Sequence, residues 1–351
     1  MHCEKIPTLK ILNSNDSIEM NNTDDRDRAG LSRPGFEESG DDGFLRKAVL
    51  PNGMQIAYQS KAELTHFYDD IFVKQIYLKN GITLKEGACV FDVGANIGLF
   101  TLFAHQVCRA GALYCFEPAP PLFRILRSNA LAYGVKAKLF NCGLSNRART
   151  ASFTFYPNSS GMSSFFGDEG EEGDALRSVL TNELRKSDPE MSRLMRYLPE
   201  LIEHRLKSEV FECSLKTMSE IITEQGVEEI DLLKIDVQKS ELDVIEGINE
   251  RDWEKIRQVV LEVHDLDGRL EKARSELLRH GFQVTTEQDE MYEGSILYNL
   301  YAIRPESRVV REDNNAVTLA TSYDRIQTRA ERQKMAQERL KTMMRERKKE
   351  S

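Results

Sequence analysis

The sequence lacks paired cysteine motifs, long apolar runs and a surplus of basic residues. Its six cysteines are scattered without a CxxC pair, so neither a disulfide framework nor a zinc site is indicated. No apolar run approaches the roughly 18 residues of a membrane-spanning helix, and the amino-terminal stretch lacks the apolar centre of a secretory signal. The net charge of -9 argues against nucleic-acid binding by the whole chain, because phosphate contacts need clustered Lys and Arg. We therefore expect a cytoplasmic protein that binds neither membrane nor nucleic acid.

Composition divides the 351 residues into several parts. Residues 1–43 are rich in Asn, Asp, Ser and Gly without an apolar period, which predicts a disordered acidic tail. Residues 44–87 predict a strand and helix cap, and residues 88–305 predict the main domain. Within that domain, 157–207 is far longer than a usual connection and predicts a helical insertion that acts as a lid. Residues 306–351 carry 12 Lys/Arg and 8 Asp/Glu and predict a charged helix, either solvated or bound to a partner.

Short apolar strands alternate with amphipathic helices in the main domain, which is the pattern of a parallel sheet with helices on both faces. The last two strands predict a closing antiparallel pair. Before the sheet, apolar side chains at 3–4 spacing predict one helix over 63–79. The expected class is α/β, a doubly wound and mostly parallel sheet of seven strands, at 89–93, 112–117, 137–144, 230–237, 257–264, 282–287 and 295–303.

A glycine-rich turn follows the first of these strands and gives the strongest chemical signal. It contains Asp92, Gly94, Ala95, Asn96 and Gly98, spaced D-x-G-x-N-x-G. Glycines allow close approach of a ligand at the carboxyl edge of an open sheet. An acid beside this turn suits a cationic ligand better than a pyrophosphate, which favours S-adenosylmethionine over a nicotinamide dinucleotide.

A second acid, Glu117, ends the next strand and precedes Pro118. A carboxylate at this place can accept both hydroxyls of a ribose, as in dinucleotide-binding folds. We therefore expect Glu117 and Pro118 to belong to the cofactor site.

Six segments are VFDVGANIGLFT (90–101), FEPAPPLFRILRSNA (116–130), LKTMSEII (215–222), IDLLKIDVQKSELDVIEGI (230–248), VVLEVHD (259–265) and LLRHGF (277–282). Together they resemble the FkbM-type S-adenosylmethionine-dependent methyltransferases, including members of polyketide and nonribosomal-peptide pathways. The resemblance implies the Rossmann-like fold of class I methyltransferases and methylation of a hydroxyl of a secondary metabolite or sugar, either free or attached to a carrier protein. One departure is that many members read Asp-Val-Glu-Gly-x-Glu where this chain has Gln238 and Lys239 between Asp236 and Glu241.

Methyl transfer from a sulfonium to oxygen needs an aligned acceptor and a group that takes its proton. The carboxyl ends of the fourth and fifth strands offer Asp236, Glu262 and His264 as catalytic candidates. We expect His264 to be the base, because histidine titrates near neutral pH, and Asp236 to position the acceptor or the histidine. A structural histidine is the alternative interpretation.

Three other hypotheses remain open from the sequence. A divalent metal held by Asp236, Glu262 and His264 is chemically reasonable, but no tight D-x-D pair supports it, and we expect no metal site. A nicotinamide-dependent oxidoreductase is disfavoured by the absent G-x-G-x-x-G. A catalytically silent cofactor-binding scaffold is the third. The sequence shows neither the acceptor nor whether oxygen, nitrogen or a carboxyl group is methylated.

Overall fold

The computed structural model describes residues 37–39, 45–168, 170, 172–174, 176, 177, 180, 197–289, 292 and 294–305. The chain divides into two units, Met1–Pro305 and Glu306–Ser351, and the second, with the expected C-terminal helix, lies outside the described residues. Most of the expected N-terminal tail lies outside them too. Its residues Glu37–Ser39, however, form strand β1 and pair antiparallel with β2 (Arg46–Val49). Within the described ranges, no helix has the length and apolar character needed to cross a membrane.

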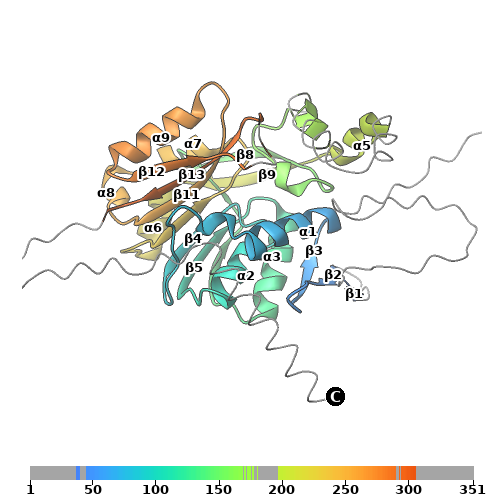
Figure 1. Cartoon of the computed structure of the whole chain (residues 1–351), viewed down its shortest axis with the longest axis horizontal. Coiled ribbons are helices and arrows are strands. Elements are labelled where there is room, and N and C mark those ends of the chain that lie inside the picture. Colours follow the sequence, from blue (N-terminus) through green and yellow to red (C-terminus); the bar gives the residue numbers. More distant parts are fainter. Residues whose placement is uncertain are drawn as a thin grey trace, which may run out of the picture. The chain divides into compact units, whose positions relative to one another are not determined.

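Seven strands form the main sheet, in the order β12-β13-β11-β10-β4-β5-β6 (Figure 1). The strands from β11 to β6 are parallel, whereas β13 runs antiparallel to both β11 and β12. The predicted α/β fold with a mostly parallel seven-stranded sheet is thus confirmed. The strands are β4 (Cys89–Val93), β5 (Ala112–Phe116), β6 (Ala137–Phe140), β10 (Leu232–Ile235), β11 (Gln258–His264), β12 (Gln283–Glu287) and β13 (Leu297–Ile303).

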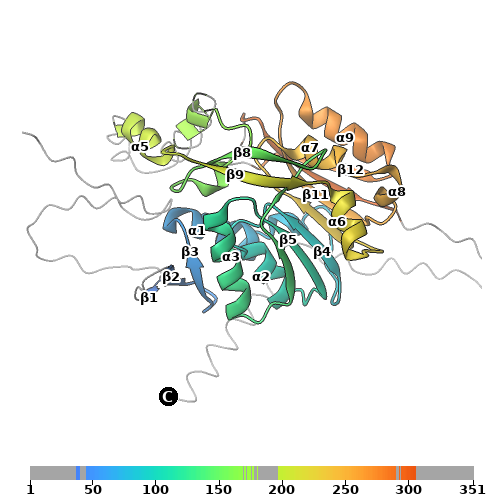
Figure 2. The same ribbon diagram turned by 180° about the vertical axis from the view of Figure 1, so that it is seen from behind.

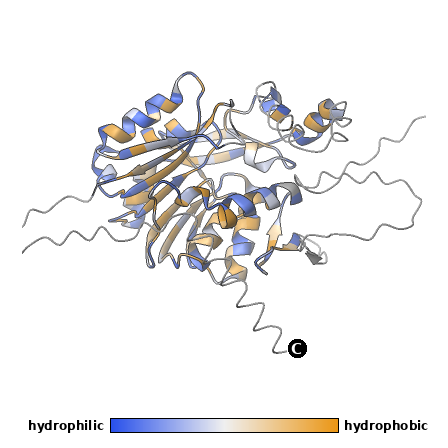
Figure 3. Cartoon of the chain, in the orientation of Figure 1, coloured by the Kyte–Doolittle hydropathy of each residue, from blue (hydrophilic) through white to orange (hydrophobic). Residues whose placement is uncertain are grey.

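Successive side chains of a strand point to opposite faces of the sheet, so the apolar side chains of these strands contribute to two cores, one on each face. Val90 and Leu232 belong to the core covered by α1, α2 and α3. Phe91 and Leu233 belong to the core covered by α6 to α9. Figure 2 shows the first set of helices from behind, and in Figure 3 the strands are largely hydrophobic. The helices are α1 (Lys61–Tyr68), α2 (Leu99–Gln106), α3 (Pro120–Ala132), α6 (Met218–Gln225), α7 (Glu241–Glu246), α8 (Glu250–Trp253) and α9 (Arg269–Arg279).

The segment before the sheet differs from the single helix expected over 63–79. After strand β3 (Gln55–Tyr58) the chain forms α1, a π-helical turn at Asp69–Val73 and a 3-10 turn at Ile76–Leu78. The break comes at Gln75, whose φ of 51° is left-handed and cannot continue a right-handed helix. This break places Tyr77 against the sheet.

Besides the main sheet, β1, β2 and β3 form one three-stranded sheet, and a further three-stranded sheet that follows β6 in the chain was not predicted. The expected third strand at 137–144 divides, because β6 ends at Phe140 and β7 (Gly143–Leu144) joins the other sheet. There β9 (Glu209–Lys216) pairs with β7 and with β8 (Arg149–Phe155). The alternation of SFTF and EVFECSLK was the period-2 signal for this pair.

The insertion at 157–207 is described only in part. A 3-10 turn, η3 (Ser160–Met162), and helix α5 (Leu198–Arg205) lie in it, and Pro199 opens α5 instead of breaking a helix. Ser164 pairs with Thr154 of β8 and with Gln238 beyond β10 as isolated bridges. The insertion therefore contacts the chain immediately after β10.

Candidate active site

The glycine turn after β4 is fixed by neighbouring backbone. Gly94 has φ +79°, and a Cβ there would stand 1.9 Å from the carbonyl oxygen of Asp236. A Cβ on Gly98, with φ +87°, would stand 2.6 Å from Cδ1 of Leu126 in α3. The N–H groups of Gly94 and Ala95 both donate to the carbonyl at the end of β5, at 3.1 and 2.9 Å. These glycines therefore allow close packing within the protein, whereas the sequence suggested space for a ligand.

Glu117 lies at the end of β5 and is 4% exposed. Its two carboxylate oxygens accept N–H groups from Asn96 and Ala119, each at 2.9 Å. Burial nevertheless raises its pKa to about 7. The carbonyl of Pro118 accepts a hydrogen bond from the thiol of Cys213 at 3.2 Å. The structure thus brings Glu117 to the turn, and each oxygen keeps a further lone pair.

Asp92 is fully buried, and its carboxylate is already paired inside the protein. Thr101 donates to one oxygen at 2.7 Å and the Lys234 ammonium to the other at 3.0 Å. The same ammonium donates to the carbonyl of Gly94 at 2.8 Å. Burial works against the charge of Lys234, but the carboxylates of Asp92 and Asp236 outweigh it and raise its pKa. Asp92 therefore acts through Lys234, and its predicted direct pairing with a cationic ligand has no support in this geometry.

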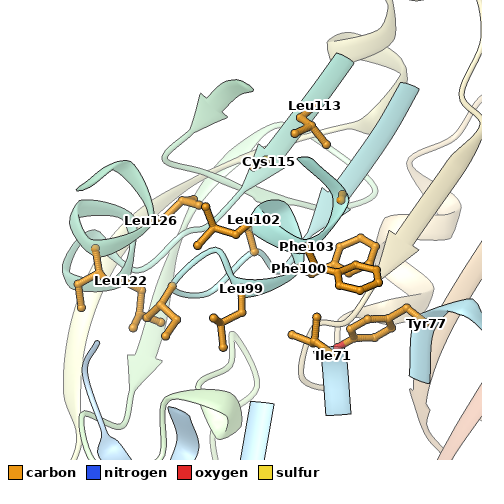
Figure 4. Packing of buried hydrophobic residues seen from close by; sticks show 14 of the residues in the cluster. Ile71, Tyr77, Leu99, Phe100, Leu102, Phe103, Leu113, Cys115, Leu122 and Leu126 are labelled. Atoms are coloured by element: carbon orange, nitrogen blue, oxygen red, sulfur yellow. The ribbon is translucent and has the colours of Figure 1, made fainter. Parts of the chain in front are cut away.

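Asp236 follows β10 and accepts a hydrogen bond from the hydroxyl of Tyr77 at 2.5 Å. The Lys234 ammonium stands 3.8 Å from the same oxygen. The Tyr77 ring packs edge-on against Phe100 with centroids 5.0 Å apart, and Figure 4 shows the two rings side by side in the apolar cluster. Burial and the charge of Asp236 raise the tyrosine pKa well above its usual value, so the phenol stays a donor.

Glu262 of β11 lies partly buried among other acids. Burial, followed by the negative charges of Asp236 and Glu241, raises its pKa well above the usual value, and Lys234 opposes this. Tyr292 is close enough that Glu262 contributes, after burial, to raising the tyrosine pKa. Asp236 and Glu262 therefore belong to one electrostatic cluster.

His264 ends β11, and its Nδ1 lies 2.7 Å from Oε1 of Glu241. Glu241 is fully buried at the start of α7, and its Oε1 also accepts the N–H of Lys239 at 3.1 Å. Because an ionised carboxylate only accepts, this pairing places the imidazole proton on Nδ1 and leaves Nε2 as the basic nitrogen. The geometry suits a general base, and it also suits a structural histidine.

Sequence reasoning missed three side chains of this site and gave Glu241 no role of its own. Lys234 could have been found, since a lone lysine in an apolar strand needs a buried counter-charge. Tyr77 and Tyr292 come from segments far away in sequence and gave no signal. In the described part of the chain, no three His, Cys, Asp or Glu side chains converge as ligands for a metal.

A doubly wound sheet, a glycine turn after its first parallel strand and an acid after the second define a Rossmann-like α/β fold. Residues 92–284 match the family model described as the methyltransferase FkbM domain. The chain belongs to this family.

Two relatives of this chain differ greatly in length. The chain is 40% identical over 256 residues to the 31-O-demethyl-FK506 methyltransferase FkbM of Streptomyces tacrolimicus, covering 73% of this chain and 95% of that protein. It is 38% identical over 276 residues to the AMB antimetabolite synthetase AmbE of Pseudomonas aeruginosa, covering 77% of this chain. The match spans only 13% of that synthetase.

Among solved structures, a methyltransferase FkbM from Methylobacillus flagellatus is similar, with a TM-score of 0.40 and 14% identity. The match covers 64% of this chain and 46% of that one. A precorrin-6y C5,15-methyltransferase from Geobacter metallireducens gives a TM-score of 0.34 and 14% identity, covering 67% and 88%. The family assignment rests on the sequence matches.

Proposed function

We propose that this protein transfers a methyl group from S-adenosylmethionine to a hydroxyl oxygen of a secondary metabolite, in the cytoplasm. The observation that carries the proposal is an acidic cluster in which Asp236 and Glu262 lie near one ammonium, Lys234, which is itself paired to Asp92. Glu241 adds a further negative charge near Glu262. Such a site favours a cationic donor over a phosphate-bearing dinucleotide.

The residues present fit this cofactor. Glu117 has lone pairs left for the two ribose hydroxyls, in addition to its two backbone partners. The cluster holds more carboxyl groups than ammonium groups, which suits the positive charges of the donor. When bound, S-adenosylmethionine supplies an activated methyl group, so the protein needs no covalent intermediate.

The chain's own part is to align the acceptor and remove its proton. We assign removal of the acceptor proton to Nε2 of His264, and Glu241 holds the imidazole ring through Nδ1. Asp236, held by Tyr77, is the group we assign to orienting the acceptor hydroxyl. The names of the relatives support a natural-product acceptor. The match within a synthetase supports testing both a free acceptor and one attached to a carrier protein.

Calorimetric titration with S-adenosylmethionine and, separately, with NADH tests which of the two cofactors the protein binds. We expect binding of the first only, and Glu117→Ala to weaken it by roughly 10–150-fold, since the ribose loses its charged acceptor. Tight NADH binding would favour the oxidoreductase alternative. Equal affinity of wild type and Glu117→Ala would remove the ribose assignment.

A further inference from the structure

Asn299 of β13 is a buried side chain whose amide makes no hydrogen bond in the described part of the chain. The residue is only 8% exposed. It is not among the described side chains whose unpaired polar atoms are sealed from solvent, so its amide still reaches solvent. An amide that is buried without a protein partner costs free energy, and a bound molecule is one way to satisfy it.

Glu262 of β11 lies directly opposite Asn299, because β11 and β13 pair antiparallel in that register (Figure 1). Opposite residues of such a pair have Cβ atoms about 4.5–5.5 Å apart. Both side chains share the sheet face of Val260 and Tyr301, which belong to the core covered by α1, α2 and α3. Glu262 is half-buried and makes no hydrogen bond or ion pair within the described ranges. Two polar side chains therefore stand side by side, and neither satisfies the other.

This pair adjoins the carboxylate that we assign to the acceptor. Asp236 and Glu262 directly follow Ile235 and Leu261, which are register partners in the parallel strands β10 and β11. Among the charges around Glu262, that of Asp236 has the largest effect on its pKa, which it raises. One carboxylate oxygen of Asp236 accepts from a tyrosine, and the other makes no hydrogen bond to the described residues. The unused groups of Asp236, Glu262 and Asn299 thus form one row across three strands.

The chemistry of this row suits an uncharged group that both donates and accepts hydrogen bonds. The amide of Asn299 offers two donors and an acceptor. Burial, followed by neighbouring negative charges, raises the pKa of Glu262 well above its usual value, which favours a protonated carboxyl that also donates and accepts. The charge of Asp236 would repel an anion, and an ammonium could not accept a hydrogen bond from the amide. A hydroxyl meets all of these conditions.

We propose that Glu262 and Asn299 form a diol subsite, which selects the acceptor by binding a second hydroxyl near the one that is methylated. The inference rests on the proposed function, because Asp236 has to hold the reacting hydroxyl. Adjacent strands are about 4.8 Å apart, so both hydroxyls belong to one small part of the acceptor. The acceptor class is therefore an alcohol whose second hydroxyl is on the neighbouring carbon or on the next one.

The test measures binding of 1,2-propanediol, 1,3-propanediol and 1-propanol to the full-length protein by NMR. The side-chain signals of Asn299 and Glu262 report binding at the subsite. Asn299→Leu and Glu262→Met remove the polar groups, and each leaves the other signal to be followed. Both should fold, because no hydrogen bond within the described ranges is lost. Glu262→Gln keeps a donor and an acceptor.

Tyr298→Phe is the matched control on the same strand. It removes the hydroxyl of a half-buried side chain next to Asn299. Tyr298 is the register partner of Val263, which belongs to the core on the opposite face of the sheet. The affinity for S-adenosylmethionine, measured for every variant, should stay unchanged, because the subsite holds the acceptor and not the cofactor.

The better of the two diols should bind the wild type about 2- to 12-fold more tightly than 1-propanol, which is the effect of one added hydrogen bond. Asn299→Leu and Glu262→Met should lose this preference, whereas Glu262→Gln and Tyr298→Phe should keep it. A wild type without the preference, or an Asn299→Leu protein that retains it, would overturn the diol subsite.

The methylated product separates this inference from the proposed function. With methyl-deuterated S-adenosylmethionine and metabolite fractions, the labelled product should carry a free hydroxyl near the new methoxy group. A labelled product with no second hydroxyl near it would overturn the diol subsite and leave methyl transfer in place. A protein that prefers diols but methylates no acceptor would refute the proposed function and leave the subsite in place.

Discussion

Lys234 and Asp92 stand directly opposite each other on the neighbouring parallel strands β10 and β4, with the ammonium 3.0 Å from a carboxylate oxygen. Both side chains are buried, at 3% and 0% exposure. The pair joins the two strand ends that carry Gly94 and Asp236. It is therefore the structural centre of the site, and several predictions depend on it.

Replacing Lys234 by Met should destabilise the protein strongly. The fully buried carboxylate of Asp92 would lose its ammonium partner and keep the hydroxyl of Thr101 as a donor, which costs about 3–5 kcal/mol. Urea unfolding measures this loss. The control is Lys234→Met combined with Asp92→Asn, which removes both charges and should recover most of the stability. A double variant as unstable as the single one would contradict the ion-pair account.

Gly94→Ala should destabilise the protein by about 2–4 kcal/mol, because its Cβ meets the Asp236 carbonyl and its φ is positive. Gly53→Ala separates the two causes, since Gly53 has φ +85° but no atom within 4 Å of an added Cβ. We expect Gly53→Ala to lose only about 1 kcal/mol. Thermal unfolding of both variants gives the comparison, and equal losses would show that the clash is relieved.

The buried carboxyl of Glu117 should make stability depend on pH. Its pKa of about 7 in the folded protein lies above the unfolded value near 4.3, so folding favours the protonated form. Its contribution is fully present below about pH 4 and is lost as pH rises through about 7, a total change of about 4 kcal/mol. Unfolding of the unliganded protein at pH 5 and pH 8 should show this change, and Glu117→Gln should lack it. An identical pH profile in the variant would assign the dependence to other groups.

His264→Ala should lower kcat by about 10²–10⁴-fold and leave affinity for S-adenosylmethionine nearly unchanged, because a base acts in the transition state. Rapid-quench measurement of the transfer step checks this. The rate of chelator-treated wild type is the companion measurement, since a metal-assisted site would lose activity with EDTA and regain it with Mg²⁺. Full activity in a chelator-treated His264→Ala protein would leave Asp236 or simple proximity as the source of catalysis.

The main sheet was predictable because each of its strands is a short apolar run bounded by turn residues. The strand β4 and its turn were found at their observed positions for this reason. The sequence also indicated Asp92 and Glu117, the acids near this turn, but it did not indicate their hydrogen-bond partners. Asp92 looked like a ligand residue because its partner Lys234 lies 142 positions away, and no local pattern shows that the two strands are neighbours.

The remaining errors have physical causes as well. The left-handed backbone at Gln75 stops a helix that the apolar spacing continues through. The break after Phe140 moves Gly143 into another sheet, although the apolar run is continuous. The sequence showed Gln238 and Lys239 only as a departure from the family pattern, whereas in the structure the Lys239 ammonium lies 3.1 Å from Glu172 of the insertion.

The central claim is methyl transfer from S-adenosylmethionine to a hydroxyl, and one measurement tests it most directly. The protein is incubated with methyl-deuterated S-adenosylmethionine and metabolite fractions, both free and carrier-bound, and products are followed by mass spectrometry and NMR. The account predicts one deuterated methyl group on an acceptor oxygen, formed more slowly by Glu117→Ala and by His264→Ala than by the wild type at matched concentrations. Label on nitrogen or on a carboxyl group, or no transfer by a protein that binds the cofactor, would contradict it.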